Sequence, residues 1–226
     1  MTIAERTGLL LGAMPPRIRR ALIAGGRRRH WPEGASIYVR GAPGGSMILI
    51  ETGRARIGIV DAAGRETILN FMGPGEVMGE IALLDAGPRS ADADAATDVT
   101  GVEIDRAAVL RMLAADPEGG LALVAELCAK LRNLSEMAEM QAQPSGAARL
   151  ARCLLRLADR WDETDADGRA VIGGGLSQGD LGAYAGLSRE TVNRLLRRWA
   201  AQGTVARGAG GLIVLRDRAA LAALAA

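Results

Sequence analysis

The stretch that most limits the possible folds of this chain is residues 31–104. It holds short runs of strand-forming residues, and turns rich in glycine and proline separate them, such as Gly41-Ala42-Pro43-Gly44-Gly45 and Gly73-Pro74-Gly75. Many short strands at even spacing with such turns indicate an all-β sandwich or barrel. The predicted strands are 36–39, 47–50, 55–60, 66–71, 90–95 and 99–104.

Helical patterns flank this β-rich stretch. Residues 5–11 and 16–24 are expected to form short helices, and they lead into the basic run 27–30. We interpret that run as a solvated edge rather than a nucleic-acid contact. After a further helix at 105–114, Asp116-Pro117 precedes a long helical pattern from Gly120 to about Gln143.

The long helix carries a narrow apolar stripe. On a helical wheel, Leu127, Leu131, Leu134 and Ala138 fall within roughly 60° of one another. A stripe this narrow is typical of a coiled-coil seam. It predicts a homodimer, and the alternative is that the stripe packs on the chain's own β-domain. The predicted dimerisation residues are Val124, Leu127, Cys128, Leu131, Leu134 and Ala138.

A short hinge ends the long helix. Pro144 cannot continue a helix, and Ser145 is a good N-cap for the next one, at 146–161. We therefore expect three parts: N-terminal helices with the β-domain at 1–115, the long helix at 116–143, and a helix-rich module at 144–226.

Residues 176–200 have the layout of a helix-turn-helix. Ser177 and Asp180 form a capping-box start, and Gly186 supplies a left-handed turn residue. Ser188 then caps a second helix, which gives two helices joined by a tight turn. A strand, a glycine-rich turn and a strand follow at 204–215, which predicts a wing with Arg207 and Arg216 available for phosphates.

The second helix divides into two faces. Leu195, Trp199, Val192 and Leu196 form one face, and arginine, glutamate and asparagine side chains form the other, which are the types that read base edges. A solvated helix face could look similar, but it would not need the turn and two caps. Residues 145–226 also hold twelve arginines against eight acidic residues, a balance of +4 that suits a polyanion. The predicted DNA-binding residues are Ser177, Gln178, Ser188, Arg189, Glu190, Asn193, Arg194 and Arg197.

Residues 79–91 form a candidate anion cassette. Gly79 opens a short helical turn whose free backbone N–H groups suit an anion. Arg89 can add a bidentate contact to a phosphate, and Glu80 is an acceptor for ribose hydroxyls. The alternative is a β-roll turn with a surface Glu80–Arg89 pair.

Two motifs carry a family resemblance. Gly79-Glu80-x-Ala82-Leu83 followed by Pro88-Arg89-Ser90-Ala91 resembles the phosphate-binding cassette of cyclic-nucleotide-binding domains. Ser188-Arg189-Glu190-Thr191-Val192-x-Arg194 resembles the recognition helix of the cyclic AMP receptor protein (CRP/FNR) regulators. The resemblance covers about residues 31–220. It implies an α+β fold with an N-terminal cyclic-nucleotide-binding, jelly-roll-like β-roll, a long dimerisation α-helix and a C-terminal winged helix-turn-helix.

The resemblance also implies roles for single residues. Arg189, Glu190 and Arg194 would read a TGTGA-like half-site, repeated as an inverted pair by the dimer. Cyclic-AMP-responsive members place a Thr-Ser pair against the purine, and this chain has Leu134-Ser135, so cAMP, cGMP or another effector stays open. The implied ligand-binding residues are Gly79, Glu80, Ile81, Ala82, Arg89, Ser90, Lys130, Leu134 and Ser135.

Composition narrows the function classes. His30 is the single histidine, and neither Cys128 nor Cys153 belongs to a CxxC pair, so we expect no metal site and no enzymatic role. No apolar run has the length of a membrane span, and the N-terminus lacks an export signal, so we expect a cytoplasmic protein. Its expected partners are double-stranded DNA, a cyclic nucleotide, a second copy and RNA polymerase. The alternatives are a same-fold regulator with another effector or none, and a regulatory subunit of a partner enzyme.

Overall fold

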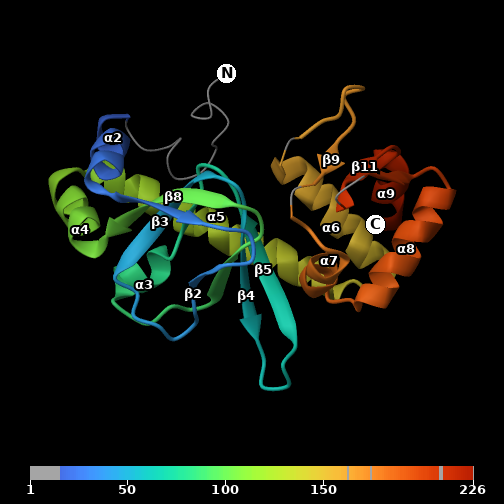
Figure 1. The fold of residues 1–226 in the computed structure, drawn as a ribbon, viewed down its shortest axis with the longest axis horizontal. Helices are drawn as coiled ribbons and strands as arrows, with labels where there is room; N and C mark the ends of the chain where they lie inside the picture. Colours follow the sequence, from blue (N-terminus) through green and yellow to red (C-terminus); the bar gives the residue numbers. More distant parts are fainter. Residues whose placement is uncertain (1–15, 162, 174, 209–210, 226) are drawn as a thin grey trace. The chain divides into compact units, whose positions relative to one another are not determined.

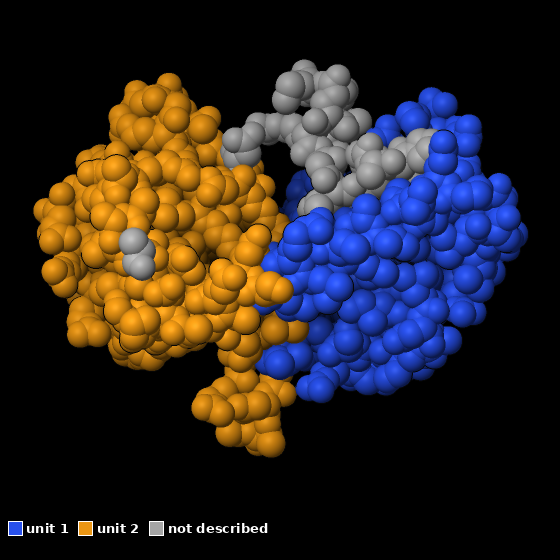
Figure 2. All heavy atoms as spheres, turned by 180° about the vertical axis from the view of Figure 1, so that it is seen from behind, with its two compact units in different colours: residues 1–59, 70–134 blue, residues 60–69, 135–226 orange. Residues whose placement is uncertain are grey.

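The structure is a computed structural model that describes residues 16–161, 163–173, 175–208 and 211–225. The helix predicted at 5–11 lies outside these residues. The chain forms two compact units (Figure 2). One holds the chain up to Ile59 together with Asn70–Leu134, and the other holds Val60–Leu69 and the chain from Ser135 onward.

Two antiparallel sheets, each of four strands, build the β-rich part (Figure 1). The first has the order β1-β8-β3-β6, with bounds Arg27–Trp31, Val99–Asp105, Ser46–Thr52 and Val77–Met78. The second has the order β2-β7-β4-β5, with bounds Ser36–Tyr38, Asp92–Ala95, Ala55–Val60 and Glu66–Met72. This arrangement confirms the β-rich domain expected from the glycine and proline turns.

Strand β3 shows why these residues hold the domain together. Its side chains alternate between two faces, as in any strand. Ile48 and Ile50 join one buried cluster, with residues of β4, β5, β7 and β8. Met47 and Leu49 join another, which includes residues of the helices. Because both faces of β3 are buried, its sequence contains the continuous apolar run 47–50 instead of alternating apolar and polar residues.

The helices of the first unit cover one face of the first sheet. They are α2 (Pro16–Gly25), α3 (Glu80–Asp85), α4 (Arg106–Ala115) and the first part of α5 (Pro117–Ala142). The cluster that contains Met47 and Leu49 also holds one residue from each of three helices: Ile18 of α2, Val109 of α4 and Leu123 of α5. The long helix is therefore anchored in the β-domain at its start.

Two strands of the first unit were missed by the sequence patterns. The basic run 27–30, expected to be a solvated edge after a helix, forms most of β1, an exposed edge strand paired with β8. It lacks the apolar alternation that marks a half-buried strand, because its side chains lie in solvent. The other missed strand, β6, has only two residues.

The second unit contains the helix-turn-helix (Figure 1). Its elements are α6 (Gly146–Trp161), β9 (Val171–Ile172), α7 (Gln178–Ala185), α8 (Arg189–Ala201), β10 (Val205–Arg207), β11 (Ile213–Leu215) and α9 (Arg218–Ala225). Ser145 accepts a hydrogen bond at Oγ from the amide of Ala148, as expected for the N-cap of α6. The three wing strands form an antiparallel sheet of order β10-β11-β9.

Candidate functional site

The cassette begins at Gly79, the residue before α3. Its φ is 83°, in the left-handed region that favours glycine. A Cβ atom at this position would lie 2.2 Å from Nη1 of Arg89, so the side chain of Arg89 also requires a glycine here. The sequence-predicted Gly79 and Arg89 are thus brought together by direct packing.

Arg89 is buried, with 6% of its surface exposed. Its Nη1 donates to the carbonyl oxygens of Ser46 (2.7 Å) and Gly79 (2.9 Å), and its Nη2 donates to Oγ of Ser46 (3.2 Å). The ring of Tyr38 lies 4.4 Å from Cζ. Glu80 is 2% exposed. The alternative of a surface Glu80–Arg89 pair is therefore wrong.

One edge of the Arg89 guanidinium has hydrogen-bond donors without an acceptor among the described residues. Nε is shielded from solvent and has no hydrogen-bond partner among the described residues. Nη2 uses one hydrogen on Ser46, so its second hydrogen remains on the same edge as the Nε hydrogen. Two parallel donors on one edge fit two oxygens of a phosphate or a carboxylate. A buried donor without an acceptor is costly, which favours an anion at this edge.

Glu80 is paired with the long helix. Nζ of Lys130 lies 2.8 Å from Oε2 of Glu80 and donates to the carbonyl oxygen of Val77 at 2.6 Å. Oε1 of Glu126 lies 3.8 Å from the same nitrogen. The predicted residues Glu80 and Lys130 thus come together from α3 and α5. A carboxylate group has several acceptor positions, so Glu80 can also accept a hydrogen bond from a ligand hydroxyl.

The other predicted ligand residues are spread between core and surface. Ala82 is 1% exposed and belongs to the core. Ile81, Ser90, Leu134 and Ser135 are exposed, the last two on α5. Ser46 and Tyr38 contact Arg89 but were not predicted, because neither stands in a recognisable motif.

The predicted caps of the helix-turn-helix are confirmed. The amide of Asp180 donates to Oγ of Ser177 (3.0 Å), and the amide of Ser177 donates to Oδ2 of Asp180 (2.8 Å), which is a capping box. Gly186 ends α7 with a φ of 65°. Oγ of Ser188 accepts from the amide of Thr191 at 3.2 Å and starts α8.

The two faces of α8 are as expected except at one residue. Val192, Leu196 and Trp199 are buried. The predicted base-reading residues Arg189, Glu190, Arg194 and Arg197 are exposed. Hydrogen bonds from its own backbone and from Ser188 lower the pKa of Glu190, so this side chain is an ionised acceptor at neutral pH.

Asn193 differs from that expectation. It is half-buried, and its Oδ1 is shielded from solvent without a hydrogen-bond partner among the described residues. Pairing with adenine uses both the oxygen and the nitrogen of the amide. Asn193 is therefore less accessible for base contact than the arginines beside it.

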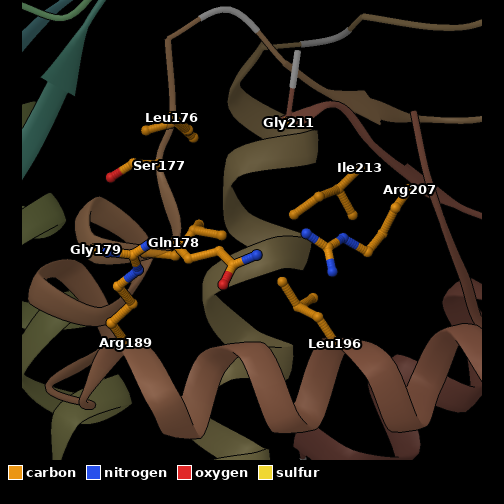
Figure 3. Close-up of a pocket in the computed structure, with 10 residues that line it drawn as sticks. Leu176, Ser177, Gln178, Gly179, Arg189, Leu196, Arg207, Gly211 and Ile213 are labelled. Carbon is orange, nitrogen blue, oxygen red and sulfur yellow. The ribbon is translucent and has the colours of Figure 1, made fainter. Parts of the chain in front are cut away.

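A hollow of about 320 Å³ lies beside α8 (Figure 3). Arg189, Arg207 and Gln178 point into it, and Leu196 and Ile213 contribute apolar walls (Figure 3). Its other lining residues are Leu176, Ser177, Gly179, Leu181 and Gly211. Two guanidinium groups around one hollow favour an anionic partner, and the predicted Ser177 and Gln178 line the same hollow.

Two kinds of feature are absent from the described residues. These residues contain no group of three or more His, Cys, Asp or Glu side chains that could hold a metal ion. Among the same residues, no helix combines the length and the apolar character needed to cross a membrane.

Comparison with known families matches both parts of the chain. The family model for the cyclic nucleotide-binding domain matches residues 28–116. The model for the Crp-like helix-turn-helix domain matches residues 148–224. The cassette and α7–α8 each lie inside one match.

Individual relatives align with this chain over most of its length. The CRP-like cAMP-activated global transcriptional regulator of Mycobacterium tuberculosis is 32% identical over 220 residues, which cover 97% of each chain. The solved structure of FixK2 from Bradyrhizobium japonicum has a TM-score of 0.79 and 26% identity, and the match covers 89% of this chain and 98% of that one. A CRP/FNR family transcriptional regulator from Thermus thermophilus has a TM-score of 0.72 and 28% identity, with coverage of 88% and 98%.

Proposed function

The chain belongs to the CRP/FNR family of DNA-binding transcription regulators and carries a cyclic nucleotide-binding domain, and we propose that cAMP or cGMP controls its binding to DNA as a homodimer. The family consists of regulators rather than enzymes. We also propose the division into residues 1–115, 116–143 and 144–226, a cytoplasmic location, and RNA polymerase as a further partner.

The open edge of Arg89 carries the effector proposal. The Nε–Nη2 edge is a buried pair of donors, and a cyclic phosphate offers two free oxygens to such a pair. Backbone amides at the start of α3 and the hydroxyl of Ser90 complete the phosphate contact in our proposal. Glu80, whose carboxylate is paired with Lys130, would accept a hydrogen bond from the ribose 2′-hydroxyl.

Leu134 keeps the identity of the base open. The Mycobacterium tuberculosis relative is named as cAMP-activated, which favours adenine. Leucine has no hydroxyl for an exocyclic amine, so position 134 does not favour adenine over guanine. Ser135 supplies a hydroxyl next to it. We therefore propose a cyclic purine nucleotide as the effector.

The exposed stripe of α5 supports the dimer. Val124, Leu131 and Leu134 are 55%, 64% and 47% exposed, and Cys128 and Ala138 are exposed beside them. Leu127 is half-buried at the edge of the stripe. The stripe is not covered by the chain's own described residues, which argues against packing on the β-domain. A contiguous apolar surface of this kind favours a protein partner, and a second copy offers the matching stripe.

The DNA proposal rests on α8. Arg189, Glu190 and Arg194 have the residue types that recognise guanine and cytosine, and all three are exposed. A twofold dimer would present two such helices, so we propose a palindromic TGTGA-like site.

One titration tests the proposal. A fluorescent duplex with two inverted TGTGA half-sites is mixed with the full chain, and DNA affinity is measured by anisotropy while cAMP or cGMP is added. We expect one or both nucleotides to raise the affinity for this duplex to at least about ten times the affinity for a scrambled duplex. If neither nucleotide binds by calorimetry while the duplex is still recognised, the chain is a same-fold regulator with another effector or none.

A further inference from the structure

Arg89 is held by both oxygens of one residue, Ser46. The carbonyl oxygen of Ser46 accepts from Nη1 and its Oγ accepts from Nη2. The two contacts occupy the outer edge of the guanidinium, the one formed by Nη1 and Nη2. Because the group is planar, fixing that edge also fixes the direction of the Nε–Nη2 edge.

Glu103 fixes the orientation of the Ser46 hydroxyl. A serine hydroxyl has one hydrogen, and that of Ser46 is donated to Oε1 of Glu103 at 3.1 Å. The lone pairs of Oγ then remain to accept from Arg89. Strand pairing explains the contact: Ile48 lies opposite Glu103 in the β3–β8 ladder, and Ser46 is the diagonal neighbour on the same face.

The basic run of β1 holds Glu103 in turn. Oε2 of Glu103 accepts from Nε of Arg29 (3.0 Å) and from Nη2 of Arg27 (3.3 Å). Burial by itself would raise the pKa of Glu103, but hydrogen bonds from Arg29 and Ser46, with the charges of Arg29 and Arg27, bring it below the usual range. Glu103 is therefore an ionised acceptor at neutral pH.

We propose that Ser46 and Glu103 are positioning residues that orient Arg89 toward the phosphate of the effector, with Arg29 as their outer support. This inference rests on the proposed function, because it takes the anion at Arg89 to be a cyclic phosphodiester. It also gives the basic run 27–30 a role other than nucleic-acid contact. Neither Ser46 nor Glu103 needs to touch the ligand.

Calorimetric titration of the full-length protein with cAMP and with cGMP tests this role. Ser46→Ala removes the hydroxyl, and we expect the affinity for a bound nucleotide to fall roughly tenfold, the usual effect of one hydrogen bond to a charged group. Ser46→Thr keeps the hydroxyl and is expected to stay within about twofold. Glu103→Gln is expected to lose about fivefold, because its amide is a weaker acceptor.

A matched control lies on the same two strands. Oγ1 of Thr52 and Oγ1 of Thr100 are hydrogen-bonded at 2.7 Å in β3 and β8, in an exposed position. Thr52→Val removes that bond, and we expect unchanged nucleotide affinity. Thermal unfolding by circular dichroism identifies any variant that fails to fold, and rescue by Ser46→Thr separates positioning from general stability.

The outcomes distinguish this inference from the proposed function. If the unsubstituted protein binds neither nucleotide, the proposed function fails and the inference fails with it. If it binds and Arg89→Lys weakens binding, but folded Ser46→Ala and Glu103→Gln variants bind like Thr52→Val, the positioning role is overturned and the proposed function stands. If Ser46→Ala and Glu103→Gln each lose affinity and the double variant loses no more than Ser46→Ala, the two residues act through one path, as proposed.

Discussion

Nζ of Lys130 and Oε2 of Glu80 lie 2.8 Å apart, in an ion pair whose side chains are 21% and 3% exposed. The pair joins the cassette helix α3 to the long helix α5 within the first unit. Glu126 shares the same ammonium group at 3.8 Å. The carboxylate that we propose for the ribose is thus already held by the helix that we propose for dimerisation.

The substitution Lys130→Met is expected to destabilise the protein. It leaves the buried carboxylates of Glu80 and Glu126 without this cation, and removing one member of a buried pair costs about 3 kcal/mol or more of unfolding free energy. Urea unfolding followed by circular dichroism at pH 7 measures the change. Arg132→Met, at an exposed cation two positions along α5, should change the free energy by no more than about 0.5 kcal/mol. Equal stabilities of the two variants would contradict the importance of the Lys130 cluster.

Replacement of Arg89 should affect both binding and folding. Arg89→Ala would remove the three hydrogen bonds to Ser46 and Gly79, so it is expected to lower stability as well as ligand affinity. Arg89→Lys keeps the charge but has no planar edge with two donors. We expect it to lower cyclic nucleotide affinity by about 100-fold, the loss of two charged hydrogen bonds.

Calorimetry on the folded Arg89→Lys variant measures this loss. Arg65→Lys, in the exposed turn between β4 and β5, is the control and should bind like the unsubstituted protein. An affinity of the Arg89→Lys variant within threefold of the unsubstituted protein would mean that the phosphate does not use the Nε–Nη2 edge.

The helix-turn-helix could be predicted from sequence because its signals are local. Ser177 and Asp180 stand three residues apart, Gly186 follows α7 directly, and Ser188 precedes α8. Each of these residues satisfies backbone groups within one turn, so spacing alone carries the information. The long helix and the hinge at Pro144 were predictable for the same reason.

The surroundings of Arg89 and Glu80 could not be predicted in this way. The contact from Arg89 to Ser46 spans 43 residues, and that from Lys130 to Val77 spans 53. No local period links such positions, because the tertiary fold brings them together. Strand β1 was missed for a related reason: its pairing with β8 is accompanied by arginine–glutamate contacts rather than by an apolar pattern.

Substitution of Leu131 tests the dimer. An aspartate at the centre of the exposed stripe would place a charge in a coiled-coil seam, so Leu131→Asp is expected to give a monomer where the unsubstituted protein is a dimer. Light scattering after size-exclusion chromatography measures the mass. Leu224→Asp, at a 41% exposed leucine of α9, is the control and should remain dimeric. A dimeric Leu131→Asp variant would place the interface elsewhere.

The two cysteines should react with a thiol reagent at very different rates. Burial raises the pKa of Cys153 to about 12, so at pH 8 this thiol is both protonated and inaccessible. Cys128 is exposed on the proposed seam and should react freely only in the monomer. We expect Leu131→Asp to speed the reaction of Cys128 and to leave Cys153 protected, as measured by absorbance with an aromatic disulfide. Fast reaction of Cys153 would contradict its buried position. The Cys153→Ala variant identifies which of the two thiols gives the signal.

Two arginines of the second unit should affect DNA binding in different ways. Arg194 lies on the exposed face of α8, so Arg194→Ala is expected to relax the preference at one base pair and to cost about 1–3 kcal/mol on the specific site. Arg207 ends β10 beside the hollow, where a phosphate contact is expected. Arg207→Ala should weaken binding about equally on all duplexes and reduce the slope of log affinity against log salt by about 1.

Anisotropy titrations on the palindromic duplex, on single-base variants and on a scrambled duplex at several salt concentrations separate the two effects. A base contact changes the ratio between duplexes, and a phosphate contact changes the salt dependence. If Arg194→Ala lost as much affinity for the scrambled duplex as for the palindrome, α8 would bind through charge alone. The exposed arginines of α8 would then form a cationic surface that binds DNA without base recognition, and the TGTGA-like site would have no support from this helix.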